Sequence, residues 1–122
     1  MKVYVVKNEQ HSLFEEQIQL LQNRFGSYEE YTVPAEGWTL EEMKDHVEFL
    51  YQNAEVVVFA SPIPYMLKEL SAIAAQAYDE SSGYKRHRLA DVLVFHNDRR
   101  EKKELPNGNV VQKVSDTGWQ LV

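Results

Sequence analysis

The hydrophobic residues of this chain follow two alternating spacings. Consecutive apolar residues that are rich in β-branched and aromatic types predict strands. Such runs occupy residues 2–6, 28–33, 56–60 and 90–95. In the segments between them, apolar residues recur every three or four positions, as on one face of a helix. The chain therefore alternates strands with helices and reaches a fourth strand near residue 90.

Residues that commonly cap helices mark the ends of the predicted helices. Ser12 with Glu15, and Thr39 with Glu42, have the spacing of a capping box. Gly26 is suited to end the first helix. Pro64 is tolerated in the first turn of the third helix. We therefore expect helices to begin near Ser12, Thr39 and Pro64.

This alternation predicts a single α/β domain over residues 1–122, a Rossmann-like three-layer sandwich with a mainly parallel sheet and helices on both faces. After the fourth strand, Asn107 and Gly108 predict a C-terminal β-hairpin. The segments 99–105, 110–114 and 119–122 are expected to be short antiparallel strands. A strand order 2-1-3-4 would place the loops after the first and third strands beside the crossover crevice.

Composition narrows the chemistry. The 122 residues include no cysteine, which excludes disulfides, thiolate nucleophiles and cysteine-based zinc sites. The four histidines show no metal-ligand spacing, so we expect no metal and no cofactor. The N-terminal residues resemble neither a signal peptide nor a membrane span, and a cytoplasmic location fits. Dinucleotide, P-loop and nucleophile-elbow motifs are absent from the sequence.

The net charge of −6 is unevenly distributed. Residues 85–103 contain seven basic and three acidic side chains, a net charge of +4, so the rest of the chain carries −10. An acidic body argues against general binding to long nucleic acid, and a local basic segment is compatible with a small anionic ligand. The alternative for residues 99–104 is a solvated edge strand whose Lys and Glu residues prevent association with other sheets.

Open parallel sheets bind ligands at the carboxyl ends of their strands. Three polar loops, 8–12, 61–65 and 96–100, follow predicted strands at that edge. Two interpretations of Ser61 stay open, contact with an anionic ligand and capping of the third helix.

Two histidines and two arginines in these loops are candidates for chemistry. His11 is a candidate for ligand contact or proton transfer, because imidazole titrates near neutral pH. Its alternative is a partly exposed helix-entry residue beside Ser12. His96 is a further candidate, because the neighbouring Arg99 and Arg100 are suited to phosphate. Its alternative is a turn residue held by Asp98.

Residues 1–26, residues 56–64 (VVVFASPIP) and residues 95–114 (FHNDRREKKELPNGNVVQKV), followed by a C-terminal aromatic residue, resemble a known group. They are similar to the small single-domain CRISPR-associated proteins of CARF-like Rossmann fold. Those proteins bind cyclic oligoadenylate second messengers, and some cleave them as ring nucleases. The likeness covers most of the chain and rests on element order, strand-end polarity and the Asn-Gly hairpin.

The resemblance implies a homodimer with the ligand, cyclic tetra-adenylate in the first place, over the carboxyl ends of the strands. It implies that Tyr65 stacks on adenine, that Asn8 and Asn97 read base edges, and that the arginines hold phosphates. His11 or His96 would move a proton, and Arg99 or Arg100 would stabilise charge. The full set implied is Asn8, His11, Ser12, Ser61, Pro62, Tyr65, His96, Asn97, Arg99 and Arg100. A lone domain would sequester the messenger or cleave it without a metal.

Two other functions stay open on the sequence. A small nucleotide- or nucleoside-processing enzyme would need a carboxylate nucleophile, for which Glu9 and Asp98 are the candidates. A non-catalytic module that dimerises through the hairpin would present Trp119 to a protein partner.

Overall fold

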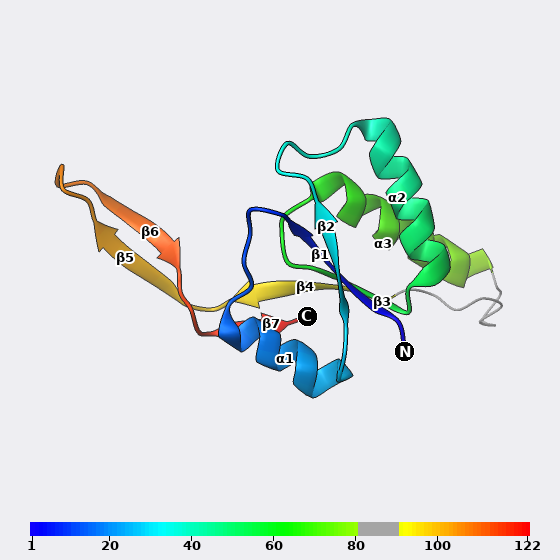
Figure 1. Cartoon of the computed structure of the whole chain (residues 1–122), viewed down its shortest axis with the longest axis horizontal. Helices are drawn as coiled ribbons and strands as arrows, with labels where there is room; N and C mark the ends of the chain where they lie inside the picture. Colours follow the sequence, from blue (N-terminus) through cyan, green and yellow to red (C-terminus); the bar gives the residue numbers. More distant parts are fainter. Residues whose placement is uncertain (81–90) are drawn as a thin grey trace.

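The computed structural model describes residues 1–80 and 91–122, and only the backbone of residues 76–80, 100, 101 and 112–114 (Figure 1). Lys85, Arg86 and Arg88 of the basic segment lie outside the described residues. The elements are β1 (Val3–Asn8), α1 (Glu15–Phe25), β2 (Glu29–Val33), α2 (Leu40–Asn53), β3 (Val56–Phe59), α3 (Pro64–Glu80), β4 (Asp91–Asn97), β5 (Arg100–Glu104), β6 (Val110–Val114) and β7 (Trp119–Leu121).

The main sheet has five strands in the order β2-β1-β3-β4-β7. Strands β1 to β4 are mutually parallel, and β7 pairs with β4 in the antiparallel direction. The parallel strands therefore have the order 2-1-3-4, which places the loops after β1 and β3 beside the crossover crevice, and β7 extends the sheet at one edge. Strands β5 and β6 form a separate antiparallel ribbon that projects from the body in Figure 1.

Two buried clusters lie on opposite faces of the sheet. Helices α2 and α3 pack on one face, where Leu50 and Met66 meet Val57 of β3. Helix α1 packs on the other, where Leu21 meets Val58. All four residues of β3 are buried, as expected of an apolar strand covered on both sides. None of the described helices combines the length and apolar composition that crossing a bilayer needs.

The predicted helix ends are partly right. Thr39 and Glu42 form the expected capping box, with Thr39 Oγ1 accepting the Glu42 N–H at 3.2 Å. Gly26, at φ 82°, donates its N–H to the Gln22 carbonyl at 2.8 Å and ends α1.

The predicted cap at Ser12 is wrong, because α1 starts after Phe14. Gln17 Oε1 accepts the Phe14 N–H at 3.0 Å and so caps the helix. Phe14 also stacks on Trp119 of β7, with ring centroids 5.7 Å apart. The start of α1 therefore coincides with packing against Trp119, near the other end of the chain. The local sequence around Ser12 does not determine where the helix begins.

Candidate functional site

The crevice between β1 and β3 is the switch point of the sheet. The chain leaves β1 toward α1 on one face and leaves β3 toward α3 on the other, so the loops at these two carboxyl ends diverge. Such a divergence opens a crevice that commonly holds ligands in α/β proteins. Residues 8–12 and 61–63 form its two sides.

His11 and Ser61 meet in this crevice, 50 residues apart in sequence. His11 Nδ1 lies 2.8 Å from Ser61 Oγ, and the same oxygen accepts the N–H of Asn8 at 2.9 Å. Ser61 reaches β1 because it lies two residues after the end of β3, where the Ala60 N–H still bonds the Val6 carbonyl at 2.9 Å. The hydroxyl is directed to β1 and not to α3, whose first-turn Leu67 N–H bonds the Ile63 carbonyl. Capping of α3 by Ser61 is therefore wrong.

The surroundings keep His11 neutral at neutral pH. Burial lowers the pKa of its imidazole below the ordinary value of 6.5, and the Lys7 ammonium lowers that pKa further. Ser61 is buried, so its hydroxyl proton needs an acceptor, and His11 Nδ1 lies within reach. We therefore assign the tautomer with the proton on Nε2. In this state His11 offers an N–H to an anionic oxygen.

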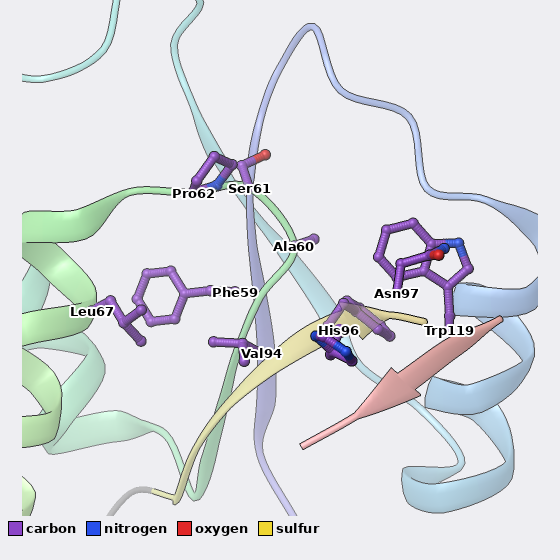
Figure 2. A pocket seen from close by; sticks show the side chains of 10 residues that line it. Phe59, Ala60, Ser61, Pro62, Leu67, Val94, His96, Asn97 and Trp119 are labelled. Atoms are coloured by element: carbon purple, nitrogen blue, oxygen red, sulfur yellow. The ribbon is translucent and has the colours of Figure 1, made fainter. Parts of the chain in front are cut away.

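Two grooves share Ser61 and Pro62. One, of about 390 Å³, is lined by Asn8, Gln10, His11, Ser61, Pro62 and Ile63. The other, of about 310 Å³, runs over the ends of β3 and β4. Figure 2 shows Ser61 and Pro62 across from His96, Asn97 and Trp119 in this second groove. His11 and His96 therefore line neighbouring grooves, and the strand ends and loops that line the two grooves are called the rim.

His96 is oriented by a carboxylate. Its Nε2 lies 2.9 Å from Asp98 Oδ1, and Asp98 Oδ2 is contacted by Gln120 of β7. An imidazole held in this way donates Nε2–H to the carboxylate and has Nδ1 as its acceptor. His96 is exposed, with 57% of its side chain accessible. It is therefore an oriented, accessible group able to accept a proton.

The two predicted base-reading asparagines are engaged with the backbone. Asn8 Nδ2 donates to the Pro34 carbonyl at 3.2 Å, and Asn8 Oδ1 accepts the Gln10 N–H at 3.0 Å. Asn97 is buried, and its Nδ2 donates to the carbonyls of Ser115 and Thr117 at 3.1 and 3.2 Å. Both amides stabilise the loops that shape the rim, and contact with a base would compete with these bonds.

The predicted arginine pair is described only in part. Arg99 Nη1 donates to Thr117 Oγ1 at 2.8 Å, and the side chain packs closely over Gly118. Arg100 begins β5, and its side chain lies outside the described part of the structure. The guanidinium of Arg99 is therefore fixed at the end of β4, next to the residues that line the second groove.

Tyr65 and Ser12 are not brought to the rim. Tyr65 lies in a separate groove between α2 and α3, together with Lys44 and Glu48. Its place in the first turn of α3 directs it toward α2 and away from His11. Ser12 is exposed and lines neither of the two grooves. The loop positions were predicted correctly, but the directions of these two side chains were not predictable from sequence order.

Trp119 and Gln10 line the rim without having been predicted as site residues. Trp119 sits there because β7 pairs with β4 in the register Asn97↔Trp119. The C-terminal aromatic was noticeable in the sequence, but only the register places it beside His96. Trp119 is partly buried against Phe14, so it does not form the open face expected of an interaction module.

The carboxylates of the nucleoside-enzyme alternative both accept hydrogen bonds within the protein. Glu9 accepts the Ala35 N–H at 2.6 Å, and Asp98 holds His96 and Gln120. Within residues 1–80 and 91–122 no group of three His, Cys, Asp or Glu side chains is arranged to hold a metal ion. The polar and aromatic groups that line the rim therefore include imidazoles, side-chain amides and an indole ring.

Comparisons with protein-family models, with curated protein sequences and with solved structures gave no match. The topology of the described residues, a mostly parallel five-stranded sheet with three helices, is that of an α/β protein and is consistent with a Rossmann-like fold.

Proposed function

We propose that this protein binds a cyclic oligoadenylate, cyclic tetra-adenylate in the first place, between two identical copies in type III CRISPR antiviral signalling. The messenger is then either sequestered or cleaved without a metal, as by a ring nuclease. In this proposal the domain is a CARF-like three-layer sandwich whose C-terminal hairpin borders the site, and the protein acts in the cytoplasm. The observation that carries the proposal is the His11–Ser61 contact at the switch point of the sheet.

Three features of the rim support an oligonucleotide ligand. His11 Nε2–H is a donor for a phosphate oxygen, and Lys7 and Arg99 add positive charge near the two ends of the rim. Pro62 and Trp119 provide flat apolar surface against which a base can stack. The two grooves share Ser61 and Pro62, and a ligand with several phosphates could contact both of them better than a mononucleotide could.

Cleavage would use the oriented imidazole at the end of β4. His96 Nδ1 would take the proton of a ribose 2′-OH, and the Asp98 carboxylate would stabilise the resulting imidazolium. The 2′ oxygen would attack the adjacent phosphorus in line, the bond to O5′ would break, and O5′ would take a proton from water, which His96 restores. The products would be a 2′,3′-cyclic phosphate and a 5′-hydroxyl. His11 would hold a non-bridging oxygen through Nε2–H.

The test is a thermal shift with cyclic tetra-adenylate, followed by chromatography of the nucleotides. A shift with intact nucleotide indicates sequestration, and a shift with linear product indicates cleavage. We expect His11→Ala to weaken binding at least about tenfold, the loss of one charge-assisted hydrogen bond. We expect His96→Ala to abolish any cleavage and to retain binding.

Tyr65→Phe is the matched control, because Tyr65 lies in the separate groove between α2 and α3 and the substitution keeps its ring. It should bind as the parent protein does. The proposal is wrong if the parent protein shows no shift with cyclic oligoadenylates of any ring size, or if His11→Ala binds as tightly as the parent.

A further inference from the structure

The ribbon formed by β5, β6 and their turn, residues 100–114, is called the arm. It leaves the carboxyl end of β4 and points away from the body in Figure 1. Among the described elements, β5 and β6 pack substantially only against each other. A two-stranded hairpin without a third strand or a helix beneath it is marginally stable in water. Packing against another protein surface would therefore stabilise the arm.

The arm combines positive charge with exposed apolar residues. Residues 100–114 contain four basic and two acidic side chains, and Lys102 and Lys103 are exposed. Val110 and Val111 are 61% and 40% exposed. The register Lys103↔Val111 places a cation beside an apolar residue on one face of the arm. A complementary surface would pair an acidic side chain with an exposed apolar one.

Helix α2 presents such a surface. Glu41, Asp45 and Phe49 are spaced four residues apart, so they form one row along the helix. Glu41 and Asp45 are exposed, and Phe49 is 43% exposed although its ring contacts Tyr4. Lys44 Nζ, 3.5 Å from Glu41, offers partial neutralisation. Like charges four residues apart destabilise a helix, so a cationic partner would relieve the row.

The arm and this row cannot meet within one chain as the structure stands. In Figure 1 the arm extends from one end of the longest axis, and α2 lies toward the other end. We propose that the arm of one copy lies along the Glu41–Asp45–Phe49 row of a second copy, with Lys103 and Val111 facing the row. Two-fold symmetry makes each copy donate one arm and receive one.

The test is sedimentation velocity of the full chain without nucleotide, at about 0.05 M and about 0.5 M salt. The parent protein should dimerise more weakly at the higher salt. The variants Lys102→Glu with Lys103→Glu, and Glu41→Lys with Asp45→Lys, should each weaken dimerisation at least about tenfold through like-charge contact. Glu42 is left intact because it caps α2. Circular dichroism checks that each variant is folded.

Mixing the two variants is the decisive experiment. In the mixed pair, acidic arms meet a basic row and basic arms meet an acidic row, so both contacts are restored and a heterodimer should form. Lys68→Glu, an exposed charge change on α3, is the control and should dimerise like the parent. The inference fails if the parent is monomeric at about 100 μM, a concentration well above ordinary dimer affinities. It also fails if the mixture yields no heterodimer.

A different partner would give a different pattern. If the arm instead binds nucleic acid, a gel shift with duplex RNA should be lost in Lys102→Glu with Lys103→Glu and strengthened in Glu41→Lys with Asp45→Lys, with no heterodimer on mixing. That outcome overturns the inference. Dimerisation is measured without nucleotide. If cyclic oligoadenylate does not bind, the test of the arm contact is therefore unaffected.

Discussion

At the scale of single residues, the hydroxyl of Ser61 joins two loops that are far apart in sequence. It accepts the Asn8 N–H at 2.9 Å and lies 2.8 Å from His11 Nδ1. Ser61 is 5% exposed, so neither bond is easily replaced by water. One small side chain therefore both shapes the switch-point crevice and orients the histidine within it.

Ser61→Ala should destabilise the protein by about 1–3 kcal/mol, because it leaves the partly buried Asn8 N–H without its acceptor. Ser12→Ala is the matched control. Ser12 is exposed and caps no helix, so its loss should cost less than about 0.5 kcal/mol. Urea unfolding of both variants measures the difference. Equal losses would show that the Ser61 hydroxyl does not hold the two loops together.

The lowered pKa of His11 predicts a pH-dependent stability. The unfolded chain takes up a proton near the ordinary pKa of 6.5, whereas folded His11 does so only at lower pH. The contribution of neutral His11 to the free energy of unfolding is therefore fully present above pH 6.5, and it is lost as the pH falls through the pKa of His11 in the folded protein. The unfolding free energy of the parent should fall more steeply than that of His11→Gln between about pH 7.5 and about pH 5. A difference in unfolding free energy between the parent and His11→Gln that stays constant across this range would contradict the lowered pKa of His11.

At the scale of elements, a clamped turn connects β6 to β7. The Asp98 N–H bonds the Gly118 carbonyl at 2.9 Å, and Asn97 holds two carbonyls of the same turn. Gly118 has a φ of 87°, and a Cβ there would lie 2.7 Å from Arg99 Cγ. The glycine thus serves both the left-handed backbone and the close approach of Arg99.

Gly118→Ala should destabilise the protein more than the same substitution at a left-handed glycine that lies in open space. Gly37 has a φ of 80° with nothing within 4 Å of a Cβ, so Gly37→Ala should lose only the conformational term of about 1–2 kcal/mol. Gly118→Ala should lose about 1–3 kcal/mol more, because Arg99 must move. Thermal unfolding of the pair measures this. Identical losses would mean that the contact with Arg99 carries no cost.

At the scale of the whole molecule, β7 joins the end of the chain to its beginning. Trp119 stacks on Phe14, meets Phe95 with ring centroids 6.1 Å apart, and donates its backbone N–H to Glu16 Oε1 at 2.7 Å. These contacts span 103 residues in the case of Glu16. They hold α1 and β4 together at the rim that carries the candidate site.

Trp119→Ala should destabilise the protein by about 3 kcal/mol, at the lower end for aromatic truncations because the ring is partly buried. Trp119→Phe keeps a ring for the two aromatic contacts. It also removes an Nε1–H that is buried without a partner among the described residues, so it should cost less than about 1.5 kcal/mol. Chemical denaturation of both variants separates the contribution of the aromatic contacts from the cost of burying the Nε1–H without a partner.

Sequence periodicity was sufficient for the features that depend on near neighbours. The four parallel strands, the Thr39 cap, the Gly26 end of α1 and the polar loops at the carboxyl edge were predicted because each depends on residues within a few positions of one another. The position of His11, Ser61 and His96 on one edge followed from the same alternation.

The tertiary structure alone decided which partner each polar side chain takes. His11 binds Ser61 across 50 residues, Asn97 binds backbone carbonyls 18 and 20 residues away, and the start of α1 accompanies packing on Trp119. Tyr65 faces α2 for a similar reason, since the packing of two helices sets its direction. The chain by itself determined the elements and their order, because periodicity is local. The candidate site arose only where separate loops met.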